Sequence, residues 1–294
     1  MFFADSQARD NACEGAQTVA APFAHTTWHF LIIFRRIIFC MLISDDLIRH
    51  NSHLMQCLGT SPSDGSHRIG WVLANHSHAG YWNAFSPSYL CLGPTQGGDI
   101  DPHLFTDPLD GSRYLVWKSD DNRLGLPVTH IWAVQVNISS AGVFLIGKPQ
   151  ILLDSTELWW AAIDYVPDGY LIEGPEIIFR DPYYYLFFAA AAYCSPTYSE
   201  GVARSKNVFG PYEKLHIPLL STGIVGSMNG SKIIGPGHAS FIQYPGADAK
   251  NDWMVVWHAS FPGETCVRTA FASYLQWGLD DWPYVVTSPA VSVI

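Results

Sequence analysis

The 294-residue chain has little charge and no long uninterrupted apolar segment. Only 14% of its residues are Asp, Glu, Lys or Arg, whereas about a quarter are charged in an average soluble domain. This shortage excludes a coiled coil and a charged helical bundle, and the 48% of hydrophobic residues exclude a disordered chain. The most apolar stretch, residues 28–43, is interrupted by Arg35 and Arg36 and is too short to span a membrane.

Positive charge is scarcer than negative charge. The chain has 16 Lys and Arg against 26 Asp and Glu, which gives a net charge of −10, and it contains no basic run. A negative protein repels phosphate groups, so the sequence predicts neither nucleic acid nor an anionic membrane as a partner.

Processing and metal motifs are also missing. The first ten residues, MFFADSQARD, contain neither a charged start nor a continuous apolar core, so no signal peptide is visible. The six cysteines are widely spread without a C-x-x-C pair, which argues against a zinc ribbon or a thioredoxin-like site. Buried thiols remain open, as do one or two disulfides in an oxidising compartment.

Aromatic and turn-forming residues are abundant. The chain has 11 Trp, 14 Tyr and 16 Phe, together with 24 Gly and 19 Pro. Many short aromatic strands joined by tight turns produce this composition, so the sequence predicts an all-β fold. Aromatic side chains also favour neutral ring-shaped ligands such as sugars.

Three segments repeat one plan: a polar residue in a Gly/Pro turn, an apolar strand, a second turn and an aromatic strand. Their leading polar residues are Asp101, Glu173 and His238, which lie 72 and 65 residues apart. An interval of that size holds four short strands, which is one blade of a β-propeller. Residues at the same turn of successive blades converge on the propeller axis. This spacing places a first blade at roughly residues 1–55, with Asp5 in the turn before its first strand.

The motifs GDIDPHLF, IEGPEIIFRDPYYYLFF, GPGHASF and VRTAFASYLQWGLDDWPYV, in this order and at blade spacing, resemble glycoside hydrolase family 43. The resemblance implies a five-bladed β-propeller, and we expect one domain over residues 1–294. It further implies hydrolysis of α-L-arabinofuranosyl or β-D-xylosyl linkages in plant polysaccharides by an inverting general acid/base mechanism.

The resemblance also assigns catalytic roles. Glu173 matches the general acid, and Asp101 matches the aspartate that positions this acid and raises its pKa. Asp5 is the candidate general base, although Ser6 stands where the family has a proline.

Three further residues match or suggest substrate contacts. Arg268 matches an arginine that contacts the sugar, and Trp82 is either a sugar-stacking platform or a core residue between blades. His238 matches a histidine at the channel centre that in many members helps to hold a calcium ion or a water. The expected enzyme requires no cofactor, with a structural Ca²⁺ in the central channel as an option. The resemblance further implies a secreted, monomeric protein.

Four of these residues also have an interpretation without a functional role. Asp101 could cap a turn, His238 could be a hydrogen-bonded core histidine, Arg268 could be a surface charge and Asp5 could lie in a frayed terminus.

The first third of the chain departs from the family pattern. The turn at Trp82 resembles a family turn that normally precedes a whole blade, but only residues 88–101 separate it from Asp101. We therefore expect two or three strands of a second blade to be missing. This departure motivates an alternative function, a catalytically impaired propeller that binds carbohydrate.

Overall fold

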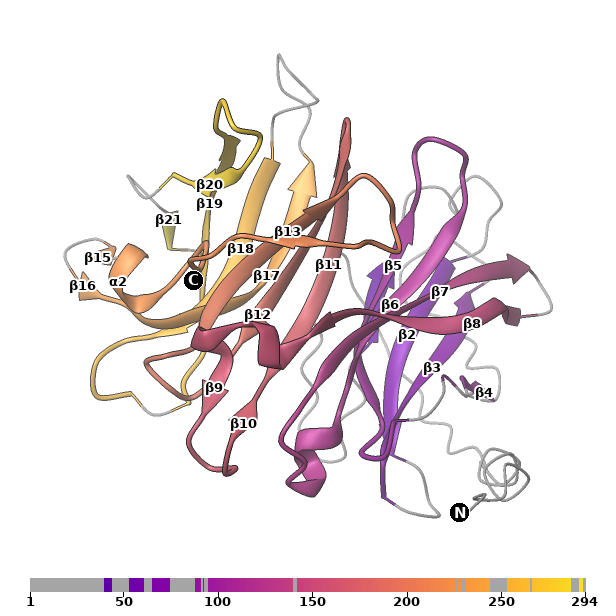
Figure 1. Cartoon of the computed structure of the whole chain (residues 1–294), viewed down its shortest axis with the longest axis horizontal. Coiled ribbons are helices and arrows are strands. Elements are labelled where there is room, and N and C mark those ends of the chain that lie inside the picture. Colours follow the sequence, from indigo (N-terminus) through magenta and orange to yellow (C-terminus); the bar gives the residue numbers. More distant parts are fainter. Residues whose placement is uncertain are drawn as a thin grey trace.

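The structure is a computed structural model in which strands predominate (Figure 1). The described residues are 40–43, 53–60, 65–74, 88–90, 92, 95–139, 142–225, 227–228, 231–243, 253–264, 266–286 and 291–292.

The described strands form four large antiparallel sheets in which the strands follow sequence order. The first contains β1 (Cys40–Ile43), β2 (His53–Thr60), β3 (His67–Ala74) and β4 (Ser88–Tyr89). The second contains β5 (Asp99–Thr106), β6 (Arg113–Ser119), β7 (His130–Ser139) and β8 (Gly142–Asp154). The third contains β11 (Ile172–Arg180), β12 (Tyr183–Ala190), β13 (Ser199–Ser205) and β14 (Glu213–Lys214). The fourth contains β17 (Ile234–Gln243), β18 (Trp253–Ser260), β19 (Thr269–Trp277) and β20 (Pro283–Val285), with β21 (Val291–Ser292) also on β19.

Short elements connect these sheets. They are the hairpins β9 (Ala162–Ile163) with β10 (Gly169–Tyr170) and β15 (Ser227–Met228) with β16 (Ser231–Lys232), the 3₁₀ turns η2 (Asp121–Leu124), η3 (Ser155–Glu157) and η4 (Trp159–Ala161), and the one-turn helix α2 (Thr222–Val225). Within the described residues, no helix has the length and apolar character needed to cross a bilayer.

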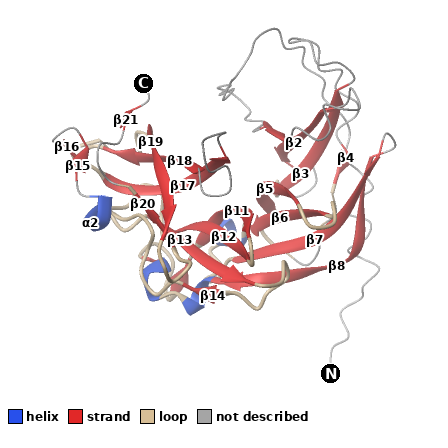
Figure 2. Cartoon of the chain, turned by 90° about the horizontal axis from the view of Figure 1, so that it is seen from above, coloured by secondary structure: helices blue, strands red, loops and turns tan. Residues whose placement is uncertain are grey.

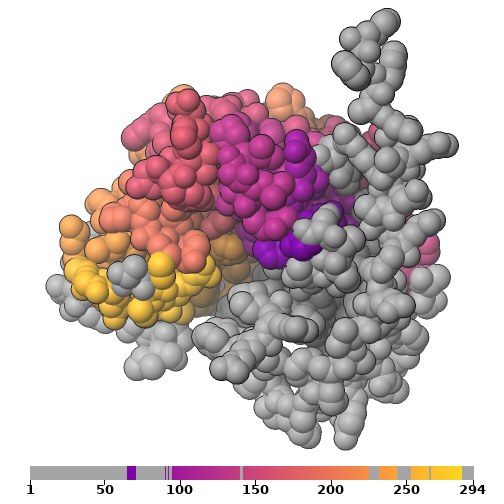
Figure 3. All heavy atoms as spheres, turned by 90° about the horizontal axis from the view of Figure 1, so that it is seen from below, coloured from indigo at the N-terminus to yellow at the C-terminus, as the bar shows by residue number. Residues whose placement is uncertain are grey.

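The sheets are arranged like the blades of a propeller. The first strands of the second, third and fourth sheets lie next to one another, because β11 contacts both β5 and β17 (Figure 2). On the face shown in Figure 3 the coloured segments of the chain follow one another in sequence order, from purple through magenta and orange to yellow. The predicted all-β fold is confirmed.

Apolar side chains pack between consecutive sheets. Alternate residues of β12 point to opposite faces, as the strand period of two requires. Leu186 and Phe188 pack toward the second sheet, with Val116 and Ile131, whereas Phe187 packs toward the fourth sheet. A third buried cluster joins Ile69 of β3 to the second sheet. Both faces of the second and third sheets are therefore covered by buried clusters, which explains the apolar and aromatic runs in their strands.

The predicted blade boundary near residue 55 is wrong. The first sheet runs from Cys40 to Tyr89, and residue 55 lies inside β2, which pairs with β1 before it and with β3 after it. The sheet beside β5 has four strands, but three of them, β1 to β3, come from residues upstream of Trp82. Within the described residues only the two-residue β4 lies between Trp82 and β5, so the expected shortage of strands in that segment is not contradicted. Asp5 and Trp82 themselves lie outside the described residues.

The packing between blades generates a stability prediction. Leu186 is fully buried between the second and third sheets. We expect Leu186→Ala to lower the free energy of unfolding by about 2–5 kcal/mol, because it removes buried methyl groups and leaves a cavity. Urea denaturation measures the change. Leu109→Ala is the control, since Leu109 is 67% exposed. Equal losses in the two variants would contradict the packing.

Candidate active site

We call β5, β11 and β17, the first strands of the second, third and fourth sheets, the inner strands. Each of them carries a pairing irregularity near its start. The shifts fall between Ile100 and His103 in β5, Glu173 and Glu176 in β11, and Gly237 and Ser240 in β17. In each case one residue has a positive φ: 52° at Asp101, 56° at Gly174 and 53° at His238. The same backbone kink therefore recurs in three sheets. In this alignment Gly174 is the equivalent of Asp101 and His238, and Glu173 precedes that position by one residue.

The kinks bring three predicted site residues together. The Gly174 N–H donates a hydrogen bond to Asp101 Oδ2 at 3.1 Å. His238 Nδ1 lies 4.0 Å from Glu173 Oε1, although the two residues are 65 positions apart. The structure thus confirms the predicted convergence of Asp101, Glu173 and His238.

Two glycines permit this close approach. A Cβ on Gly174 would lie 3.0 Å from the Cγ and Nδ1 of His238, and the positive φ adds strain for any other residue. A Cβ on Gly237 would lie 2.6 Å from Cε1 of Tyr198. His238 and Tyr198, which lie beside Glu173, therefore have room only because the residue that each contacts is a glycine.

Tyr198 and Lys118 complete the surroundings of Glu173. The Tyr198 hydroxyl donates to Glu173 Oε1 at 2.6 Å. Lys118 Nζ lies 3.5 Å from Glu173 Oε2 and 3.5 Å from Asp120 Oδ1, and only 2% of the Lys118 side chain is exposed. We use the term central cluster for Asp101, Lys118, Glu173, Tyr198 and His238.

The sequence analysis missed Lys118 and Tyr198. Lys118 stands in the strand RYLVWKS, where a lysine follows a run of apolar and aromatic residues. Lys118 pairs with Ile100, Ala189 with Glu173, and His258 with Gly237. Lys118, Ala189 and His258 therefore occupy equivalent positions in the second strands of the three sheets. Aligning the second strands of the repeats could have identified the position, but the two-strand register was needed to place its ammonium beside Glu173.

The charges of the central cluster oppose one another. Burial raises the pKa of Glu173, but the Lys118 ammonium and the His238 imidazole outweigh burial and bring the pKa well below its usual range. Burial raises the pKa of Asp101, and the neighbouring Glu173 adds to this rise. The pKa direction of Glu173 is opposite to the one expected for a general acid, because Lys118 was not part of that expectation.

His238 is a cation in this environment. Burial lowers the pKa of His238, but the Asp101 and Glu173 carboxylates overcome this and raise it to about 9. His258 behaves in the opposite way: burial and the nearby Arg268 lower its pKa to about 3. The neutral His258 ring stacks on Tyr198, with ring centroids 5.6 Å apart.

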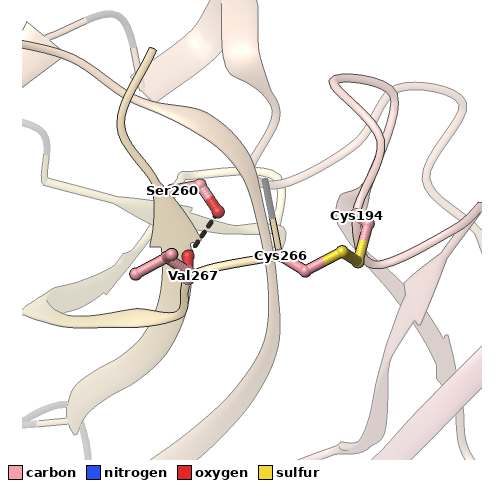
Figure 4. Close-up of a disulfide and its surroundings, with 4 residues drawn as sticks. All are labelled: Cys194, Ser260, Cys266 and Val267. Atoms are coloured by element: carbon pink, nitrogen blue, oxygen red, sulfur yellow. Dashed lines mark hydrogen bonds between the residues drawn. A yellow bond between two sulfur atoms is a disulfide. The ribbon is translucent and has the colours of Figure 1, made fainter. Parts of the chain in front are cut away.

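Arg268 is exposed and lies close enough to His258 to lower the pKa of that histidine. Its guanidinium carbon lies 4.3 Å from the ring centroid of Tyr193. The adjacent Cys194 forms a disulfide with Cys266, and this bond joins the loop after β12 to the loop before β19 (Figure 4). Ser260 Oγ donates to the Val267 carbonyl at 2.5 Å and fixes the second loop. This disulfide, which the sequence left open, therefore anchors the loop that carries Arg268.

Two buried glutamates link the third sheet to the fourth. Glu176 accepts a hydrogen bond from the Phe241 N–H at 2.9 Å, and Glu200 accepts one from the Ala239 N–H at 3.1 Å. Burial raises the pKa of Glu176 to about 7 and that of Glu200 to about 8. Both receive N–H groups next to the kink at His238, so they hold the backbone that positions this histidine.

The described residues contain no group of three or more His, Cys, Asp and Glu side chains that could hold a metal ion. Calcium requires six to eight oxygen ligands, whereas His238 offers an imidazole whose Nδ1 lies 4.0 Å from Glu173 Oε1. These residues do not fit a calcium site built from protein ligands, and no step below involves a metal.

Comparisons with known proteins agree with the geometry. The model of glycosyl hydrolases family 43 matches residues 46–283. A "Xylosidase/arabinosidase" from Butyrivibrio fibrisolvens is 28% identical over 243 residues; the match covers 81% of this chain and 42% of that protein. The chain therefore spans less than half the length of that relative.

Solved structures establish the architecture. A thermostable family-43 glycoside hydrolase has a TM-score of 0.67 at 24% identity, covering 87% of this chain and 77% of that one. An α-L-arabinofuranosidase from Lactobacillus brevis has a TM-score of 0.63 at 18% identity, covering 84% and 74%. The similar structures are five-bladed propellers, and the described residues of this chain form four blades of that fold.

The disulfide generates a prediction for this site. Cys194 and Cys266 are 72 residues apart, and a cross-link of that length restricts the unfolded chain by about 4 kcal/mol. We expect Cys194→Ser with Cys266→Ser to lower the free energy of unfolding by roughly this amount in urea without reductant. With dithiothreitol the two proteins should have equal stability, because the cross-link is then open in both. Equal stability of both proteins without reductant would contradict the cross-link.

Proposed function

The chain belongs to glycosyl hydrolases family 43, and on this premise we propose that it is an inverting O-glycosyl hydrolase. Its proposed substrates carry α-L-arabinofuranosyl or β-D-xylosyl linkages, as in plant polysaccharides. The observation that carries the proposal is the convergence of Asp101, Glu173 and His238 from three successive sheets.

The proposed chemistry uses two carboxyl groups. Protonated Glu173 donates its proton to the glycosidic oxygen while the bond between that oxygen and the anomeric carbon breaks. A water attacks the anomeric carbon from the opposite face and gives its proton to a general base, for which Asp5 remains the candidate. Inversion requires about 6.5–9.5 Å between the two carboxyl groups, because the water lies between them. Asp101 and His238 hold the backbone and the carboxylate of the acid in place.

Substrate binding has to raise the pKa of Glu173. In the free protein Lys118 and His238 stabilise the carboxylate. A sugar ring over this carboxylate removes water from it, and this desolvation disfavours the charged form. The proton is then available where a general acid needs it.

Other parts of the proposal concern the surroundings of the site. Arg268 and Trp82 are proposed to contact the sugar, and Arg268 has the donors to bind ring hydroxyls. The Cys194–Cys266 disulfide supports secretion, because disulfides persist in oxidising compartments. We also propose that the protein acts as a monomer.

One observation favours a second candidate, a propeller that binds carbohydrate without cleaving it. Glu173 is ionised in the free protein, and an acid that stays ionised with sugar bound cannot protonate a leaving group. Calorimetric binding of arabino- or xylo-oligosaccharides without turnover would favour this candidate.

The acid assignment predicts a dependence on the leaving group. We expect Glu173→Ala to lower kcat/KM on xylo- or arabino-oligosaccharides by about 10²–10⁴-fold, because no other group donates the proton. The loss on 4-nitrophenyl glycosides should be much smaller, because nitrophenolate leaves with little protonation. Glu213→Gln is the control, since Glu213 is 66% exposed in a surface ion pair. Equal losses on both substrate types would contradict the assignment.

A further inference from the structure

Lys118 is a buried cation placed between two carboxylates. Its Nζ lies 3.5 Å from Glu173 Oε2 and 3.5 Å from Asp120 Oδ1, while its side chain is 2% exposed. The lysine belongs to β6 and Glu173 to β11, so the contact joins two sheets. The equal distances mean that the ammonium has two counter-ions within reach.

Asp120 is itself held from other directions. Its Oδ2 accepts a hydrogen bond from Nδ1 of His67 at 2.7 Å and lies 3.9 Å from Nε of Arg123. Only 7% of the Asp120 side chain is exposed. Asp120 therefore connects the buried Lys118 to His67 and Arg123, whose side chains are 37% and 31% exposed.

This arrangement bears on the proton cycle of the proposed hydrolase. When Glu173 carries a proton, Lys118 loses one of the two carboxylates that lie 3.5 Å from its Nζ. A buried ammonium without a counter-ion is strongly disfavoured, and this would oppose protonation of the acid. Asp120, at the same distance, keeps the ammonium paired.

We propose that Lys118 is a positioning residue for Glu173 and that Asp120 is its alternative counter-ion, which keeps Lys118 paired whenever Glu173 is protonated. The proposal rests on the proposed function and deepens it, because it assigns the regulation of the acid to residues that do not contact the sugar in that mechanism. Asp120 acts on Glu173 only through Lys118 and through the electrostatic field.

The remaining charges act equally in all variants of the test. Asp101, His238 and Tyr198 also face Glu173, with His258 and Glu200 beyond them. Asp101 also faces Lys118, and Tyr165 interacts electrostatically with Lys118, Glu173 and Asp120. Since these groups stay in place, a change at Lys118 or Asp120 tests the arrangement of Asp120, Lys118 and Glu173, which we call the relay. The two changes should act in opposite directions.

The expected signs follow from charge. Lys118→Met removes the cation that stabilises ionised Glu173, so the pKa of Glu173 rises by about one unit or more. Asp120→Asn leaves Lys118 with Glu173 as its nearest counter-ion, so the pKa of Glu173 falls by roughly half a unit to one unit. Because the acid works in its protonated form, the alkaline limb of kcat/KM moves up in pH for the first variant and down for the second.

The experiment titrates Glu173 directly. The protein is labelled with ¹³C at the glutamate side-chain carboxyl, and the Glu173 signal is assigned by its loss in Glu173→Gln. The pH profile of 4-nitrophenyl glycoside hydrolysis is recorded in parallel. Lys214→Met and Asp281→Asn are matched controls from surface ion pairs, and neither should move the Glu173 signal.

Opposite shifts in Lys118→Met and Asp120→Asn support the relay, and shifts in the same direction or no shifts overturn it. If Lys118→Met does not fold, Asp120→Asn decides alone: a downward shift supports the relay, and no shift or an upward shift overturns it. Failure of the wild-type protein to hydrolyse any glycoside contradicts only the proposed function, because the NMR titration still tests the relay.

Discussion

The site depends on the pairing of buried charges. Asp101, Glu173 and Asp120 bring three carboxyl groups into the region where the inner strands meet, and each would be costly there without a partner. Lys118 and His238 supply the positive charge, at 3.5 Å and 4.0 Å from Glu173. Both cations come from other sheets than Glu173 does, so the charges can be balanced only when neighbouring blades are packed. Electrostatics and blade packing therefore stabilise each other.

The backbone makes this pairing possible. A kink with a positive φ recurs at Asp101, Gly174 and His238, and it turns the start of each inner strand toward its neighbours. Gly174 leaves room for the His238 ring, and Glu176 and Glu200 receive N–H groups of β17 on the far side of the kink. The position of His238 is thus fixed by the third sheet as much as by its own strand.

The repeats predicted much of this arrangement. Asp101, Glu173 and His238 were identifiable because each stands in a Gly/Pro turn before an apolar strand, and such turns meet on a propeller axis. Lys118 was not, because its role depends on the pairing of Lys118 with Ile100 across two strands. The burial of Glu176 was not predicted either, because it depends on a hydrogen bond to another sheet. The boundary at residue 55 was misplaced because the first sheet lacks the motifs that mark the later ones.

The central claim is that this cluster performs hydrolysis with inversion, and the configuration of the first product tests it most directly. During hydrolysis of 4-nitrophenyl β-D-xyloside or α-L-arabinofuranoside, ¹H NMR of the anomeric proton distinguishes the two configurations before mutarotation. The account predicts that α-D-xylose or β-L-arabinofuranose appears first. Initial release of β-D-xylose or α-L-arabinofuranose would contradict it, because retention requires a carboxylate that attacks the anomeric carbon instead of a water.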